Sequence, residues 1–274
     1  MKEKNEKPIK QRRFCMKMKS LGFIGGGRIT GIILEGLDRK DKRPERVFVS
    51  ETNPEVLSKL ADRFPKIKTS AGDIKGPAAS AMVFIALHPP AVMGILDGIK
   101  EHLKKDAVVV SLAPKLSIAQ LSTGLGGFDR IVRMIPNAPS VINKGYNPVA
   151  FSPAFSGEEK KEIRKFFEVL GDCPEVKEEN LEAYAILTAM GPTYLWFQLE
   201  ELKDLGLSFG LSAKETEKAL TKMVKGTVKT LFESNRPPTE VMDLVPLKPI
   251  GEDEEAIRNI YRTKLKGLYA KLKG

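Results

Sequence analysis

The sequence of 274 residues has few of the residues that build metal centres and disulfide frameworks, with two cysteines and two histidines. Cys15 and Cys173 are too few for a set of disulfides or for a zinc site, so we expect no metal and a reducing, cytoplasmic environment. No run of about 18 apolar residues occurs, which excludes a predicted transmembrane helix. Residues 1–18 are basic but lack an apolar stretch, so we interpret them as a solvated extension rather than a secretory signal.

The composition is that of a globular protein, with 42% hydrophobic and 29% charged residues. The net charge of +10 comes from basic residues that gather near the two ends of the chain. One interpretation is attraction to nucleic acid or membrane through released counterions. We favour solvated ends that help to attract an anionic ligand, because no aromatic residues alternate with the charges and no nucleic-acid-binding motif is present.

Short apolar runs alternate with helix-like segments between residue 20 and about residue 150. Such runs, separated by helix-length segments, are typical of a parallel sheet buried on both faces. The predicted strands are 21–25, 46–50, 81–87, 107–112 and 130–135. We therefore expect a doubly wound α/β domain, a Rossmann fold, over residues 19–155.

After about residue 155 the pattern is helical only. An amphipathic helix is predicted over 157–171, and a long apolar helix over 179–207 is interrupted by Gly191-Pro192. Ser212 with Glu215 three residues later forms a predicted capping box at the start of the next helix, and a last helix follows near the C-terminus. We expect residues 156–274 to form an all-helical domain.

A glycine triplet, Gly25-Gly26-Gly27, lies between the first predicted strand and the first predicted helix. Glycines there permit a tight turn and let the backbone approach the pyrophosphate of a dinucleotide, which the helix N-terminus then binds. Glu51 directly follows the second predicted strand, where an acidic side chain accepts hydrogen bonds from the adenosine ribose. This favours NAD over NADP, but the nearby basic residues Arg28, Arg43 and Lys59 leave both cofactors open.

Several segments, in order and at the expected spacing, resemble the pyrroline-5-carboxylate reductases, which reduce the last imine of proline synthesis. The segments are GFIGGGRITGIILEGL (22–37), FIALHPP (84–90), SLAPKLSIAQL (111–121), RMIPNAPSVINKG (133–145) and GPTYLWFQLEELKDLGLSFGL (191–211). The resemblance implies a Rossmann domain followed by a helical substrate and dimerisation domain. It also implies an NAD(P)-dependent oxidoreductase acting on a C=N group, assembled as a homodimer, with no membrane or nucleic-acid partner.

The resemblance also implies roles for individual residues. The cofactor-binding residues it implies are Gly25, Gly27, Arg28 and Ile29 at the pyrophosphate, Leu87, His88 and Pro89 beside the ribose, and Ala113 and Asn137 towards the nicotinamide. Glu200 and Thr193 are the implied catalytic residues, with Glu200 near the substrate amine. Alternative interpretations remain for two of them: Glu200 pairs with Lys203 on a helix surface, and His88 is a half-buried residue at a strand end.

The chain departs from the family pattern on the substrate side. The family carries Ser-Pro-Gly-Gly-Thr-Thr where this chain has DLVPLKPIGEDEE (243–255), which lacks comparable hydrogen-bond donors. Met190 replaces a serine, and the family's Ala-Ala-Gly reads Ala113-Pro114-Lys115. Lys248 is either a replacement charge for a carboxylate or simply exposed. We expect an oxidoreductase for a small cyclic imine or amino-acid-like substrate whose identity stays open. The alternative is a catalytically degenerate dinucleotide-binding sensor or scaffold.

Overall fold

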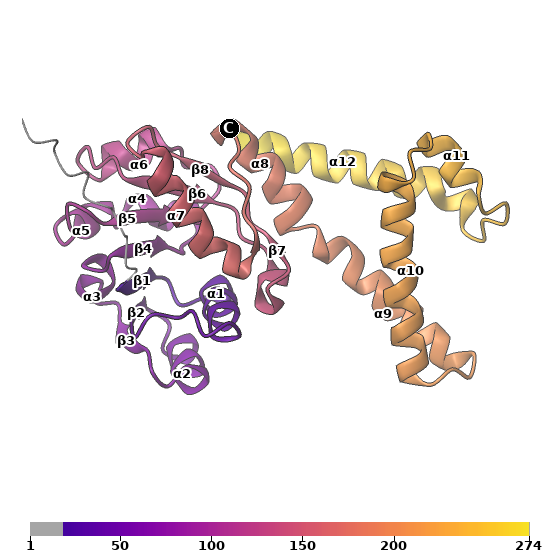
Figure 1. Cartoon of the computed structure of the whole chain (residues 1–274), viewed down its shortest axis with the longest axis horizontal. Coiled ribbons are helices and arrows are strands. Elements are labelled where there is room, and N and C mark those ends of the chain that lie inside the picture. The colour runs from indigo at the N-terminus through magenta and orange to yellow at the C-terminus, as the bar shows by residue number, and fades with distance from the viewer. Residues whose placement is uncertain (1–18, 274) are drawn as a thin grey trace, which may run out of the picture. The chain divides into compact units, whose positions relative to one another are not determined.

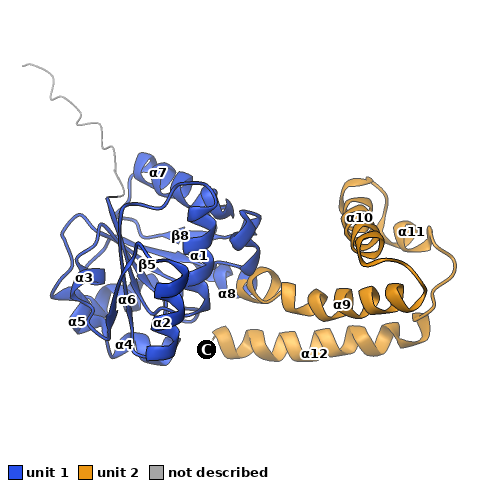
Figure 2. Cartoon of the chain, turned by 90° about the horizontal axis from the view of Figure 1, so that it is seen from below, with its two compact units in different colours: residues 1–184 blue, residues 185–274 orange. Residues whose placement is uncertain are grey.

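The computed structural model describes residues 19–273, which form two compact units. The first unit extends to Tyr184 and the second begins at Ala185 (Figure 2). The predicted N-terminal extension, including Cys15, lies outside the described residues.

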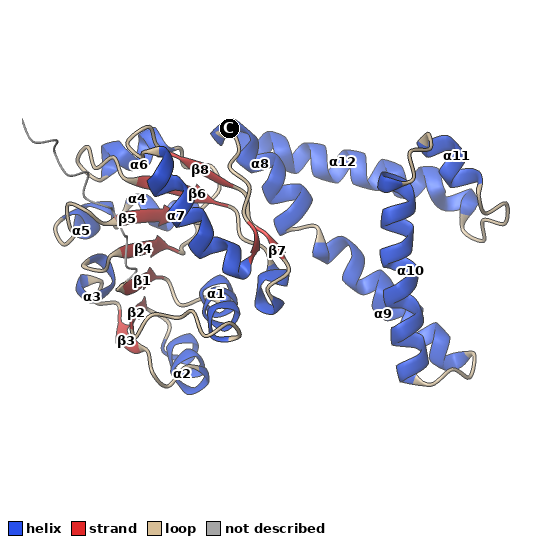
Figure 3. Ribbon diagram, viewed as in Figure 1, coloured by secondary structure: helices blue, strands red, loops and turns tan. Residues whose placement is uncertain are grey.

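The first unit is built on one seven-stranded sheet in the order β3-β2-β1-β4-β5-β6-β8 (Figures 1 and 3). The first six strands in this order pair in parallel, and β8 pairs with β6 in the antiparallel direction. This is the expected doubly wound arrangement with one extra edge strand. The strands are β1 Ser20–Ile24, β2 Arg46–Glu51, β3 Lys68–Ala71, β4 Met82–Ile85, β5 Val108–Ser111, β6 Ile131–Met134 and β8 Val149–Phe151.

The sheet is buried on both faces because helices cover both of them. Along β4, Met82 and Phe84 belong to one apolar cluster, while Val83 and Ile85 belong to the other. Helices α1 and α7 pack on the first face, and α4, α5 and α6 contribute to the second. The helices of this unit are α1 Arg28–Asp38, α2 Pro54–Arg63, α3 Lys75–Ala78, α4 Pro89–Met93, α5 Leu96–Lys100, α6 Ile118–Gly124, α7 Gly157–Phe167 and α8 Leu181–Tyr184.

The sequence prediction missed several short strands. Strand β3 reads KTSA and is only partly buried, so it carries no apolar run. Strand β8 has three residues, and the pair β7 Gly145–Tyr146 and β9 Gly171–Asp172 has two residues in each strand. The first unit also extends beyond the predicted boundary near residue 155, because Ile163 and Phe167 of α7 pack into the core of the sheet.

The second unit is entirely helical in the described residues. Its helices are the π-helical turn Ala185–Ala189, α9 Pro192–Ser208, α10 Ala213–Glu233, α11 Pro238–Asp243 and α12 Glu254–Lys273 (Figure 3). The predicted interruption at Gly191-Pro192 is confirmed, since Pro192 begins α9. The predicted capping box is also confirmed, with the Ser212 side chain accepting the Glu215 N–H. No helix within residues 19–273 combines the length and the apolar content needed to cross a bilayer.

Most of the exposed large hydrophobic side chains of the described residues lie in this second unit. Within residues 19–273, all of the exposed large hydrophobic side chains except Met93, Ile142 and Tyr146 belong to it. Leu272 is buried, but Phe209 and Phe232 are each more than three-quarters exposed. Exposed apolar side chains that gather in one part of a protein are typical of an interaction surface.

Candidate functional site

The turn that follows β1 depends on Gly25. This residue has a φ of +104°, and a Cβ atom at this position would lie 2.4 Å from the carbonyl oxygen of Ala86. The Thr30 hydroxyl donates a hydrogen bond of 2.7 Å to the Gly25 carbonyl, and the Gly25 N–H donates one of 2.8 Å to Ser50. Gly25 is therefore required by the turn itself, because a left-handed backbone and a close approach both exclude a side chain.

The N-terminus of α1 has free backbone N–H groups that could bind an anion. Gly27 is its N-cap residue, no side chain caps the described helix, and no acidic residue occupies the first turn. Side chains cap α2, α6, α7 and α10, through Asn53, Ser117, Ser156 and Ser212, whereas α9 and α11 share with α1 the lack of such a cap. A Cβ atom added to Gly27 would meet no atom of the described chain within 4 Å. Open space beside uncapped N–H groups at a helix N-terminus fits the pyrophosphate of a dinucleotide.

Glu51 lies directly against the glycine turn. Its Oε2 atom accepts the Gly26 N–H at 2.8 Å, and its Oε1 atom accepts the Asn53 N–H at 2.9 Å. The half-buried carboxylate at the end of β2 is thus held in one orientation and retains lone pairs for further donors. The sequence predicted the place of Glu51 but not its bond to Gly26, which depends on the parallel pairing of β1 with β2.

The ends of β1, β4 and β5 lie at one edge of the sheet, since Ile24 pairs with Ile85 and Ile85 pairs with Ser111. At this edge Leu87 and Pro89 are half-buried. His88 is the N-cap residue of α4 and is exposed, so the alternative of a half-buried histidine is wrong. Ala113 is buried in the core cluster below this edge.

Asn137 is buried in the turn that follows β6. Its Oδ1 atom accepts the Tyr146 N–H at 3.0 Å, and its own N–H donates to Oδ1 of Asn147 at 3.1 Å. These bonds tie the turn to β7. The predicted approach of Asn137 to the nicotinamide stays a prediction.

An ion cluster that the sequence analysis did not predict holds the loop after β5. The guanidinium of Arg133, on β6, is 3% exposed and donates to Glu178 at 3.1 Å and to Glu182 at 2.6 Å. Glu182 also accepts the Lys115 N–H at 3.2 Å, and Glu178 accepts the Ile118 N–H at 2.6 Å. Burial acts to raise the pKa of Glu182, but the hydrogen bond and charge of Arg133 outweigh it and lower that pKa. The available signal was an arginine inside an apolar strand, which requires an acidic partner.

Lys115, within this loop, has a φ of +72°, in the left-handed region. Glycine adopts this conformation freely, whereas for other residues it costs roughly 1–2 kcal/mol. The position corresponds to the glycine of the family's Ala-Ala-Gly. The Lys115 side chain is exposed, while its N–H is fixed by Glu182.

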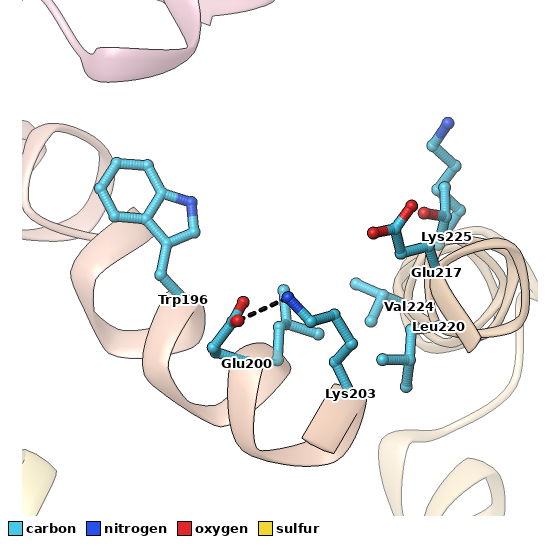
Figure 4. Close-up of a pocket in the computed structure, with 9 residues that line it drawn as sticks. Trp196, Glu200, Lys203, Glu217, Leu220, Val224 and Lys225 are labelled. Atoms are coloured by element: carbon cyan, nitrogen blue, oxygen red, sulfur yellow. Dashed lines mark hydrogen bonds and ion pairs between the residues drawn. The ribbon is translucent and has the colours of Figure 1, made fainter. Parts of the chain in front are cut away.

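The two predicted catalytic residues lie on α9, in the second unit. Figure 4 shows the groove between α9 and α10, where Glu200 pairs with Lys203 opposite Leu220 and Val224. The hydrogen bond with Glu200 raises the pKa of Lys203. The ion pair between Glu200 and Lys203, which was the alternative interpretation of Glu200, is therefore present. A role of Glu200 near a substrate amine stays a proposal. The Thr193 hydroxyl donates to the carbonyl of Met190 at 2.6 Å in the first turn of the helix.

The segment that replaces the family's donor loop is also in the second unit. Leu247, Lys248 and Ile250 are exposed, and Arg258 is paired with Glu254 beside them. A pocket in this region is lined by Lys248, Ile250, Glu254 and Arg258, together with Gln198, Gly251, Ile257 and Tyr261. This segment therefore presents one lysine, several apolar side chains and five exposed carboxylates rather than a row of hydroxyl donors.

Comparison with known proteins supports both halves of the chain. Residues 20–115 match the family described as NADP oxidoreductase coenzyme F420-dependent, and residues 178–272 match the pyrroline-5-carboxylate reductase dimerisation family. The chain is 25% identical over 255 residues to pyrroline-5-carboxylate reductase of Corynebacterium melassecola, covering 92% of this chain and 94% of that protein. It is 26% identical over 241 residues to the reductase of Escherichia coli, covering 88% and 89%.

Solved structures agree in fold along nearly the whole chain. Pyrroline carboxylate reductase of Plasmodium falciparum, with NADP bound, superposes with a TM-score of 0.73 at 20% identity, covering 94% of this chain and 97% of that one. The reductase of Coxiella burnetii gives a TM-score of 0.65 at 24% identity, covering 93% and 95%. With a Rossmann unit, a helical unit that matches the dimerisation family and the family motifs in order, the chain is similar to the pyrroline-5-carboxylate reductases over nearly its whole length.

Proposed function

We propose that this protein is an NAD(P)-dependent oxidoreductase that reduces the C=N bond of a small cyclic imine bearing a carboxylate. The observation that carries the proposal is the uncapped N-terminus of α1 behind the Gly25 turn, with Glu51 fixed beside it. The relatives named pyrroline-5-carboxylate reductase support the reaction class.

The chain contributes binding and orientation to this reaction. The N–H groups at the start of α1 hold the pyrophosphate, and Glu51 accepts hydrogen bonds from the adenosine ribose. When bound, the nicotinamide supplies the hydride. An imine that arrives protonated already carries the positive charge that accepts hydride, so no strong general acid is required. We assign Glu200 a place near the substrate nitrogen, where its negative charge favours the protonated imine.

We propose NAD as the preferred cofactor. The Glu51 carboxylate is held at the end of β2 by Gly26 and Asn53, where it suits two ribose hydroxyls and repels a 2′-phosphate. NADP is the alternative, because Arg28 is exposed next to the turn. The difference is measurable as the ratio of dissociation constants for NADH and NADPH, and tighter binding of NADPH would reverse the assignment.

Two measurements on the full chain test the activity. Fluorescence titration with NADH and NADPH is expected to give micromolar binding, and oxidation of the bound cofactor is expected with cyclic imine carboxylates such as pyrroline-5-carboxylate. Binding without turnover of any cyclic imine or keto acid would instead establish a dinucleotide sensor or scaffold. Absence of binding to either dinucleotide would contradict both functions.

We propose that the exposed apolar surface of the second unit is covered by a second copy of the chain. The match to a dimerisation family supports this partner. The wild-type protein is expected to sediment at about twice its chain mass of 30.3 kDa. A Phe197→Glu variant places a charge on the exposed face of α9 and is expected to be largely monomeric at micromolar concentration. The matched control, Met93→Glu, changes an exposed apolar residue of the first unit and should leave the dimer intact. A monomeric wild type would contradict the proposal.

A cytoplasmic location is kept as a proposal. It is supported by the small number of cysteines, which suits a reducing compartment. Cell fractionation with antibody detection tests it.

A further inference from the structure

We propose that Lys115 binds the carboxylate of the substrate and so determines the specificity of this protein for imines that bear a carboxylate group. The inference rests on the proposed function, because it assigns a binding partner to one group of that substrate. It is carried by the backbone conformation of Lys115, by the ion cluster that fixes it, and by its place at the edge of the sheet.

The conformation of Lys115 is unusual for its residue type. In the part of the chain that the structure describes, four residues other than glycine have a positive φ: Asp41, Lys115, Asn143 and Asn235. Aspartate and asparagine tolerate this region because their short side chains bond to the local backbone, whereas lysine gains nothing comparable. Replacing such a residue by glycine would relieve the backbone strain. Strained residues cluster at functional sites, where the function of the side chain compensates for the cost of the strain.

The surrounding structure holds this conformation firmly. The Lys115 N–H donates to the buried carboxylate of Glu182, which the guanidinium of Arg133 holds in turn. Glu178 fixes the same loop three residues later through the Ile118 N–H. Both carboxylates are already engaged, and the Lys115 ammonium forms no salt bridge with any of residues 19–273. Lys115 therefore presents an exposed ammonium group from a backbone that these hydrogen bonds hold in place.

The position of Lys115 fits the substrate better than the cofactor phosphates. The proposed pyrophosphate and ribose sites follow β1 and β2, while Lys115 follows β5, which is separated from β1 by β4. With strands about 4.8 Å apart, this places the loop roughly 10 Å along the edge, in the half of the sheet that serves the nicotinamide. The substrate must meet the nicotinamide there. The altered segment 243–255 has lost its donors, and its Lys248 lies among exposed residues without a comparable anchor.

The test compares a charged ligand with its neutral counterpart. Proline, a saturated cyclic amino acid with a carboxylate, and prolinamide, which lacks that charge, are titrated by calorimetry into the wild-type complex with NADH. Lys115→Met removes the ammonium and keeps the length of the side chain, and Lys115→Arg restores a positive charge. Thermal unfolding and NADH affinity are measured for each variant.

We expect Lys115→Met to weaken proline binding about tenfold or more, as loss of a charge-assisted hydrogen bond requires. Prolinamide binding, NADH affinity and the melting temperature should stay close to wild type, and Lys115→Arg should recover most of the loss. If proline and prolinamide weaken equally, or neither changes, the role of Lys115 is refuted while the proposed function stands. A loss of NADH affinity would instead assign Lys115 to a cofactor phosphate. A wild-type complex that binds none of the cyclic amino acids and reduces no imine carboxylate would overturn the proposed function, and this inference with it.

Discussion

A Gly27→Ala variant is expected to keep its fold and to lose about 100-fold or more in affinity for NADH and NADPH, since two lost hydrogen bonds to phosphate are worth about 3 kcal/mol. Gly27 has an ordinary φ of −67°, and an added Cβ would meet no atom of the described chain. The methyl group would instead occupy the space in which the pyrophosphate must approach the N–H groups of α1. Fluorescence titration measures the affinity, and thermal unfolding checks the fold.

Two further glycines serve as controls for this variant. Gly157→Ala also adds a methyl group in open space at the start of a helix, α7, and should change neither stability nor affinity appreciably. Gly25→Ala should instead destabilise the unit by several kcal/mol, because it combines a φ of +104° with a contact of 2.4 Å to the Ala86 carbonyl. Wild-type affinity in Gly27→Ala would show that the cofactor does not approach this turn.

The second large effect is expected for Arg133→Met, which should lower the free energy of unfolding by about 3–5 kcal/mol. The substitution leaves the Glu182 carboxylate, 7% exposed, without its cation in the interior of the first unit. It also loosens the hydrogen bonds that these carboxylates accept from Lys115 and Ile118. Denaturant unfolding followed by circular dichroism measures the change.

A nearby surface pair provides the matched control for Arg133. Lys177 and Glu179 are 3.9 Å apart and are 79% and 70% exposed, so Lys177→Met should cost less than about 0.5 kcal/mol. An equal loss in the two variants would contradict a buried cluster.

The same cluster predicts a pH dependence of stability. The pKa of Glu182 is lower in the folded state than its ordinary value of 4.5. The ionised carboxylate therefore makes its full contribution to folding stability above pH 4.5. The contribution is lost as the pH falls through the lowered pKa. Between pH 4.5 and pH 3, a Glu182→Gln variant should therefore lose stability with a shallower slope than the wild type. Equal slopes would show that Glu182 does not titrate with folding.

Much of the first unit could be predicted because its signals are local. Buried parallel strands read as apolar runs, and Asn53 with Pro54 marked the start of α2, where the Asn53 side chain accepts the Glu55 N–H. The missed strands β3 and β8 have no such run, because an edge strand needs only partial burial and follows from pairing with its neighbour. In the second unit the helices were visible, but the π-helical turn before Gly191 was not, since it depends on backbone geometry.

For the candidate site, the sequence by itself determined that a glycine turn joins a buried strand to a helix and that an acidic residue follows the next strand. These features depend on residues close together in the chain. Only the tertiary structure separated Gly25, which the turn requires, from Gly27, which faces open space. It also joined Arg133 to Glu178 and Glu182, 45 and 49 residues away, and through them fixed Lys115 in its left-handed conformation. A charge buried in a strand shows that partners are needed, but only the packing of distant segments decides which partners they are.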